Sequence, residues 1–116
     1  MNRYSLIWSN LRLEQLLEAY RNSTEHIVPR LARFHIEFEG IHPFIDGNGR
    51  TSRLLMNLYL LRHGYVIITL KGSNDAKVNY YKALEMSHTE QLPEDFQKLV
   101  IEAEIAALQK YLSIMA

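Results

Sequence analysis

Helical spacing of the apolar residues is the feature that most limits how this 116-residue chain can fold. Apolar side chains recur three or four residues apart along stripes at residues 13–20, 27–38 and 96–111. This spacing is typical of helices that bury one face. A further segment, residues 50–62, is apolar on nearly every side, which predicts a central, buried helix. We therefore expect an all-α bundle of about five helices.

Local breaks in this pattern predict where the helices begin and end. Gly40 is expected to end the second helix, and Gly64 is placed to cap the third in the left-handed conformation. Residues 65–70 are rich in β-branched side chains and are predicted to form a short extended piece. Ser73 is a residue type that caps helix N-termini, so a further helix is expected to follow it.

Size and charge restrict the class of protein. A chain of 116 residues, 47% of them hydrophobic, suffices for a single domain, which we expect to span residues 1–116. Thirteen Lys and Arg balance thirteen Asp and Glu, so nucleic acid is not an expected partner. No apolar stretch approaches the ~20 residues that a membrane span needs. With no visible signal peptide and no cysteine, the simplest expectation is a cytoplasmic protein.

The segment at residues 42–53, HPFIDGNGRTSR, concentrates the polar chemistry of the chain. It leads directly into the most apolar predicted helix, whose first N–H groups and dipole would attract anions. Gly47 and Gly49 would let the backbone turn sharply and approach a ligand closely. Arg50 and Arg53 are three residues apart and would share one helix face near its N-terminus. The segment therefore predicts a cradle for a polyphosphate.

Two other residues of the segment would supply chemistry to such a cradle. Asp46 offers hard oxygen ligands suited to a Mg²⁺ ion that also contacts phosphates. His42 offers an imidazole, the side chain best able to take a proton near neutral pH. The Gly-Lys-Ser/Thr of a Walker loop and the third glycine of the dinucleotide fingerprint are both missing. The predicted cradle is therefore of another kind.

The same segment resembles the signature of the Fic family, His-x-Phe-x-(Asp/Glu)-Gly-Asn-Gly-Arg-x-x-Arg. Each specified position is met, by His42, Phe44, Asp46, Gly47, Asn48, Gly49, Arg50 and Arg53. The lead-in at residues 35–42, the stretch at residues 53–57 and the pair Tyr80-Tyr81 are also similar to the family. The resemblance covers roughly residues 27–84 and implies a Fic-type helical bundle.

By this resemblance, the chain would be a protein adenylyltransferase that moves AMP from ATP to a Ser, Thr or Tyr hydroxyl of a target protein. His42 would deprotonate that hydroxyl, and Asp46 would hold Mg²⁺ against the α- and β-phosphates. The resemblance also implies an anion hole and phosphate clamp made of Gly47, Asn48, Gly49, Arg50 and Arg53, a loop anchor at Phe44, and an adenine-pocket border at Tyr80 and Tyr81. His88 stands where family members carry an Asn near adenine.

Two features that are usual in the family have no counterpart in the sequence. The β-hairpin flap that clamps the target's main chain is not found, and neither are the first helices, so we expect a bundle that lacks both. The inhibitory motif Ser/Thr-x-x-x-Glu-Gly/Asn is not found either. Glu39-Gly40 matches its end, but His35 stands four residues before Glu39. Inhibition would then come from a separate antitoxin-like protein, from a lost N-terminus, or not at all.

Alternatives remain open beside the transferase. One is a catalytically silent Fic fragment that binds a nucleotide or a partner. Another is a Doc-like protein kinase, which Gly49 disfavours because that branch has Lys there.

His35 lies on an apolar stripe and is expected to be a hydrogen-bonded core histidine. The stripe at residues 96–111, if uncovered, would favour self-association, so a homo-oligomer is expected.

Overall fold

The computed structural model describes residues 3–43 and 46–115. In these ranges the chain forms helices and no strand, which confirms the all-α bundle. The helices are α1 (Arg3–Asn22), α2 (Ile27–Ile41), α3 (Asn48–Arg62), α4 (Asn74–Thr89) and α5 (Glu94–Met115). None of these described helices combines the length and the apolar character that a membrane crossing requires.

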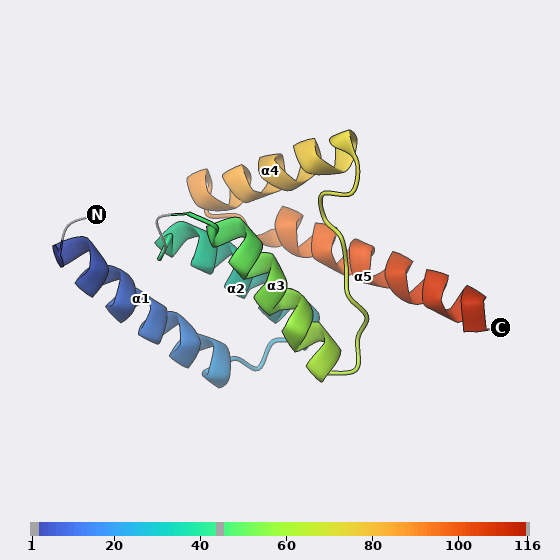
Figure 1. The fold of residues 1–116 in the computed structure, drawn as a ribbon, viewed down its shortest axis with the longest axis horizontal. Coiled ribbons are helices and arrows are strands. Elements are labelled where there is room, and N and C mark those ends of the chain that lie inside the picture. Colours follow the sequence, from blue (N-terminus) through green and yellow to red (C-terminus); the bar gives the residue numbers. More distant parts are fainter. Residues whose placement is uncertain (1–2, 44–45, 116) are drawn as a thin grey trace.

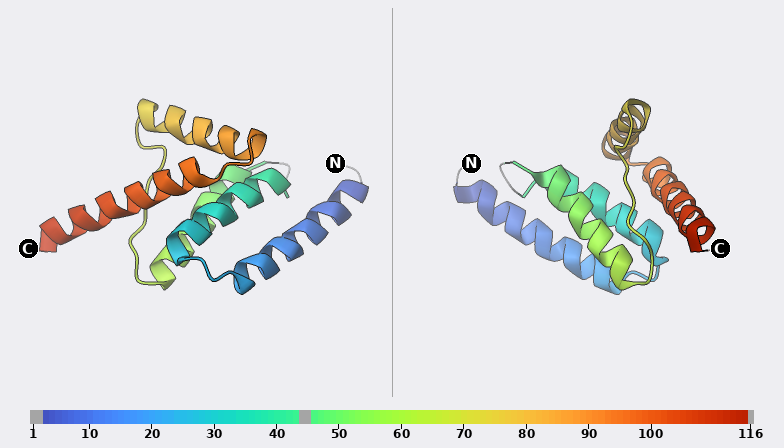
Figure 2. Two further views of the ribbon diagram at one scale, coloured as in Figure 1. Left: turned by 180° about the vertical axis from the view of Figure 1, so that it is seen from behind. Right: turned by 45° about the vertical axis from the view of Figure 1, so that its right-hand side comes forward.

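Helix α2 is the centre of the bundle and packs against each of the other four helices. Helices α1, α2 and α3 lie side by side with alternating direction, while α4 and α5 cover the remaining side of α2 (Figures 1 and 2). Eight of the fifteen residues of α2 are buried, and they are Val28, Leu31, Ala32, Phe34, His35, Ile36, Phe38 and Ile41. The lead-in to the polar segment is therefore anchored in the core.

The expectation that the helix of residues 50–62 is buried on all sides is wrong. Within the described residues, α2 is the helix against which α3 packs. Leu54, Leu58 and Leu61 on its outer face are 61%, 53% and 54% exposed. Hydrophobicity makes burial favourable, but the number of neighbours that surround a helix is set by the packing of the whole chain.

The C-terminus of α2 also differs from the prediction. Gly40 stays helical, and α2 continues to Ile41. The left-handed cap position is taken by His42, with φ 55° and ψ 56°, and its N–H donates to the Phe38 carbonyl at 3.1 Å. A left-handed residue with a β carbon costs roughly 1–2 kcal/mol. The fold therefore carries a modest backbone strain at the first residue of the polar segment.

The segment between α3 and α4 confirms the predicted cap residues, Gly64 at the end of α3 and Ser73 at the start of α4. Gly64 has φ 85°, and the Tyr65 N–H donates to the Leu60 carbonyl at 2.9 Å. The extended piece after it is fastened to α3 by Asn57, which accepts from the Ile68 N–H at 2.9 Å and donates to the Ile68 carbonyl at 3.1 Å. Ser73 then caps α4 by accepting from the Ala76 N–H. This segment carries the chain from the far end of α3 back to its N-terminus.

Candidate functional site

The polar segment joins the end of α2 to the start of α3, and we call residues 42–47 the motif loop. His42 is exposed, with Nδ1 at 3.4 Å from the Glu39 carbonyl oxygen. The Asp46 side chain is 93% exposed, and its Oδ1 accepts from the Gly47 N–H at 2.8 Å. The predicted anchor Phe44 lies outside the described residues. The imidazole and the carboxylate predicted to carry chemistry are thus both accessible from solvent.

Helix α3 begins without a side-chain cap from its N-cap residue. Gly47 occupies that position with φ 78°, a left-handed conformation that glycine adopts without a steric cost. It has no side-chain oxygen to accept from the first-turn N–H groups, as Ser or Asp would. Asn48, the next residue, is only 4% exposed. The N–H groups of the first turn of α3 receive no side-chain cap from Gly47. They lie, with the positive end of the helix dipole, at the loop where an anion was predicted.

The two arginines of the motif have different surroundings. The Arg50 side chain is 77% exposed, and its Nη2 lies 3.8 Å from Asp46 Oδ2. Arg53 is partly buried, and its Nη1 donates to the Tyr80 hydroxyl at 3.2 Å. The Arg53 guanidinium carbon lies 5.7 Å from the centre of the Tyr80 ring. One arginine is thus held only at the surface, whereas the other is fixed against the core.

Gly49 makes room for Arg53. A β carbon at this position would lie 2.9 Å from Arg53 Nη1 and 3.2 Å from Glu39 Oε1. The first distance is shorter than real contacts allow, so any larger residue would have to displace the guanidinium. The sequence suggested that this glycine allows a ligand to come close, and the structure adds that it leaves room for the side chains of Arg53 and Glu39 beside the first turn of α3.

A buried polar cluster of His35, Ser52 and Tyr80 lies beneath the motif loop. His35 Nε2 is 2.6 Å from the Tyr80 hydroxyl, and His35 Nδ1 is 2.6 Å from Ser52 Oγ. The three residues are 0%, 0% and 1% exposed, and the His35 ring stacks on Phe96 with the ring centres 5.1 Å apart. His35 is therefore the hydrogen-bonded core histidine that the sequence predicted.

Burial fixes the protonation states of this cluster. It lowers the pKa of His35 to about 4 and raises the pKa of Tyr80 to about 12. Both groups are therefore neutral around pH 7. The Tyr80 hydroxyl can then donate to His35 Nε2 while its oxygen accepts from Arg53. Tyr80, the hydrogen-bond partner of Arg53, therefore stays in its neutral, protonated form.

The two tyrosines of the pair differ in accessibility. Tyr80 is 1% exposed, whereas Tyr81 is 52% exposed and carries a ring that a ligand could contact. Lys71 Nζ donates to the Tyr81 hydroxyl at 2.6 Å, and this hydrogen bond is the main reason that the pKa of Tyr81 is lowered. Sequence reasoning missed Lys71, because nothing in its neighbours marks it before the fold places it beside the tyrosines.

Metal binding at this site would depend on Asp46. No group of three or more His, Cys, Asp or Glu side chains that could hold a metal is found among the described residues. Magnesium sites that act on nucleotides commonly use one or two carboxylates together with the substrate phosphates. The single exposed carboxylate of Asp46, beside the start of α3, fits this kind of site rather than an all-protein cage.

Comparisons with known proteins agree with the geometry. The sequence profile of the Fic/DOC family matches residues 3–60. Protein adenylyltransferase Fic from Drosophila sechellia is 43% identical over 77 residues, and the protein of the same name from Drosophila yakuba is 47% identical over 79 residues. Each match covers 66% of this chain, which spans about 15% of the relative's length.

A solved structure has the same fold. Fic-1 from C. elegans superposes with a TM-score of 0.83 at 28% sequence identity. The superposition covers 93% of this chain and 33% of that chain.

Proposed function

Because this chain belongs to the Fic/DOC family, we propose that it transfers AMP from ATP to a Ser, Thr or Tyr hydroxyl of a target protein. The observation that supports the proposal is that the described motif residues gather at one helix junction, with Arg53 held by Tyr80 at the start of α3. The relatives named protein adenylyltransferase Fic support the same activity.

In the proposed reaction, a bond forms between the target oxygen and the α-phosphorus of ATP. The bond from the α-phosphorus to the bridging oxygen breaks, and pyrophosphate leaves with the electron pair. His42 takes the proton of the hydroxyl. Its exposed position at the left-handed end of α2 supports this role, because an incoming protein side chain can reach the imidazole there.

Binding and charge neutralisation supply most of the catalysis in phosphoryl-type transfers. We assign the α- and β-phosphates to the backbone of Gly47, Asn48 and Gly49 at the start of α3. The β- and γ-phosphates are assigned to the guanidiniums of Arg50 and Arg53. Tyr81 offers the accessible ring at the adenine border, while Tyr80 acts by orienting Arg53.

Magnesium is part of the proposal, with Asp46 as its protein ligand. When bound, Mg²⁺ would neutralise charge on the phosphates. The Asp46 carboxylate already accepts one hydrogen bond from the Gly47 N–H, which orients it beside the helix start. It therefore needs no rearrangement of the core to face the phosphates.

The setting is proposed on the same basis. We place the chain in the cytoplasm as one Fic-like domain over residues 1–116, acting on a target protein. A separate antitoxin-like inhibitor and assembly into a homo-oligomer belong to the proposal as well. Five large apolar residues on α5 are exposed, which supports a covered α5 in the assembly: Ile105, Tyr111, Leu112, Ile114 and Met115.

The test uses ATP labelled at either the α- or the γ-phosphate, together with candidate targets. Label retained from the α-position is the expected result. Label from the γ-position alone would indicate a kinase, and ATP binding without any label would indicate a binding module. His42→Asn is expected to slow transfer by about 100- to 10,000-fold with no change in thermal stability. His63→Asn, at another exposed histidine, is the matched control.

A further inference from the structure

Lys71, a second positively charged residue, lines the same small pocket as Arg53 but lies outside the motif. The pocket has a volume of about 180 Å³ and lies between α3 and the extended segment that follows it. Arg53 and Lys71 both line it, with Asn57 and Thr69 as the other polar residues. Among the described residues, none that lines the pocket is acidic. In the described part of the chain, neither cation forms an ion pair with a carboxylate, although Glu39 Oε1 lies near Arg53 Nη1 where both flank Gly49.

Both cations lie beside the ring of Tyr80. Lys71 Nζ lies 5.9 Å and the Arg53 guanidinium carbon 5.7 Å from the centre of the Tyr80 ring. Lys71 also donates to the Tyr81 hydroxyl, which uses one of the three donors of its ammonium group. The two positive groups thus share the Tyr80 ring and line the same pocket, although they come from separate elements of the chain.

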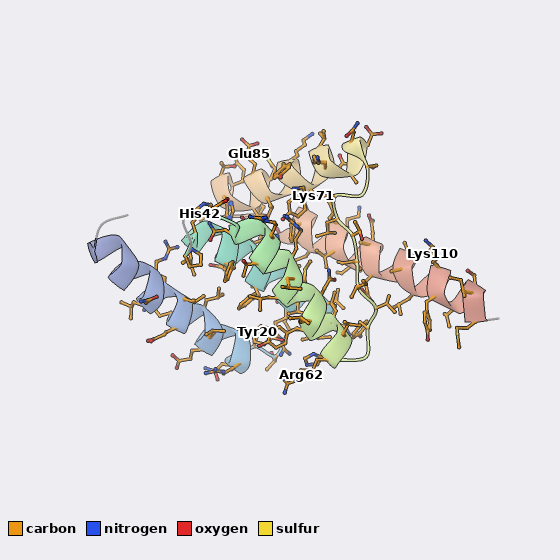
Figure 3. The ribbon with its side chains drawn as sticks, in the orientation of Figure 1. Tyr20, His42, Arg62, Lys71, Glu85 and Lys110 are labelled. Atoms are coloured by element: carbon orange, nitrogen blue, oxygen red, sulfur yellow. The ribbon has the colours of Figure 1, made fainter. Side chains whose placement is uncertain are left out.

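The path of the chain sets the position of Lys71. The paired hydrogen bonds between Asn57 and Ile68 hold the extended segment on α3 three residues before Lys71. The buried side chain of Leu70 fixes the segment again, one residue before it. In the view of Figure 3, the labelled residues His42 and Lys71 lie to either side of the upper end of α3.

We propose that Lys71 is a further phosphate-binding residue and that, with Arg53, it holds the β- and γ-phosphates of ATP, the part that leaves as pyrophosphate. This inference rests on the proposed function. Two positive charges that line one pocket repel each other, and an anion bound between them relieves that repulsion. An ammonium forms strong, charge-assisted hydrogen bonds with phosphate oxygens. As the bond to the α-phosphorus breaks, negative charge grows on the pyrophosphate, and Lys71 stabilises it.

Direct binding measurements on the intact chain test this role. ATP and AMP are titrated in the presence of Mg²⁺ into the unaltered protein and into Lys71→Ala, Lys71→Arg and Lys77→Ala. Lys77 is an exposed lysine on α4 and controls for the general loss of one positive charge. We expect Lys71→Ala to weaken ATP about tenfold and to leave AMP unchanged, since AMP lacks the groups that Lys71 holds. Lys71→Arg should retain most of the affinity, and inorganic pyrophosphate should bind less tightly to Lys71→Ala than to the unaltered protein.

Two results of the binding measurements would overturn the inference. ATP affinity that is unchanged in Lys71→Ala would show that the residue does not touch the phosphates. An equal loss for ATP and AMP would show that Lys71 merely supports Tyr81 or the fold. The transferase proposal is separable, because a chain that binds ATP through Lys71 but retains no α-label contradicts the transferase alone. A chain that transfers AMP equally well with Lys71→Ala contradicts this inference alone.

Discussion

The motif loop and the buried polar cluster beneath it are built on opposite principles. In the loop, His42 and Asp46 are exposed, and their side chains make few polar contacts with other described residues. In the cluster, His35, Ser52 and Tyr80 are enclosed and joined by short hydrogen bonds. The groups proposed to meet substrate are thus free to do so, while the groups that position them are locked in the core.

Arg53 is the link between the two regions. It lies on the first turns of α3, but its guanidinium is bound to the Tyr80 hydroxyl. A residue placed this way needs no large rearrangement to bind phosphate, and preorganised charge is the more effective kind in catalysis. If this comparison is right, changes in the cluster should lower stability, whereas changes in the loop should alter chemistry with little effect on stability.

The largest effect on stability is expected from the protonation of His35. The pKa of His35 is lowered by burial from 6.5 to about 4 in the folded chain. Between these values the unfolded chain binds a proton that the folded chain does not, so the free energy of unfolding falls as the pH is lowered. The loss should approach about 3 kcal/mol by pH 4. Urea denaturation between pH 7 and pH 4 measures it.

The control for this prediction is His35→Gln, which keeps an uncharged donor and acceptor but does not titrate. The carboxylates are the same in both chains and contribute equally to the pH dependence. The unfolding free energy of His35→Gln should therefore vary less with pH than that of the unaltered chain, because the histidine contribution is gone. His63→Gln, at an exposed histidine, should leave the pH dependence as it was. Parallel curves for His35→Gln and the unaltered chain would contradict the role given to the cluster.

A smaller effect is expected where the loop meets the cluster, at Gly49. The added methyl group of Gly49→Ala must displace Arg53, which should cost about 1–3 kcal/mol and also weaken ATP binding. Gly64→Ala is the matched variant, because Gly64 has φ 85° and nothing within 4 Å of its would-be β carbon. It should lower stability by about 1 kcal/mol through backbone strain alone. Calorimetric titration with ATP separates the two, and unchanged ATP affinity in Gly49→Ala would refute this account.

The smallest effect is expected at Arg50. Arg50→Gln breaks only an exposed pair at 3.8 Å, so the unfolding free energy should change by no more than about 0.5 kcal/mol. Arg53→Gln should cost about 1 kcal/mol or more, because it removes the hydrogen bond to Tyr80. Both variants should bind ATP less well. Equal destabilisation by the two substitutions, measured by thermal unfolding, would mean that Arg53 is not held by the core as described.

Much of the fold could be predicted from local patterns. The helical spacing gave the fold class, Gly64 and Ser73 marked the helix boundaries around the extended segment, and His35 was expected in the core. The end of α2 was misplaced, because the left-handed position went to His42 instead of a glycine. The burial of α3 was overestimated for a different reason, since an apolar sequence does not show how many neighbours a helix has.

The candidate site was predictable to the extent that it is continuous in sequence. The spacing of the motif residues along the chain already places a histidine before the loop, glycines in the turn and arginines on the next helix. Lys71 and the contact between Arg53 and Tyr80 were not predictable in this way. Residues 53 and 80 are 27 positions apart, and nothing local to either one reports their meeting.

The sequence by itself determined which segments are helical and how the motif residues are ordered, because both follow from interactions between residues a few positions apart. The tertiary structure alone decided that α2 is the centre, that α3 shows an apolar face to solvent, and that Tyr80 reaches His35 across 45 positions. These features depend on how whole helices exclude water from one another, and that balance is settled only when the complete chain is packed.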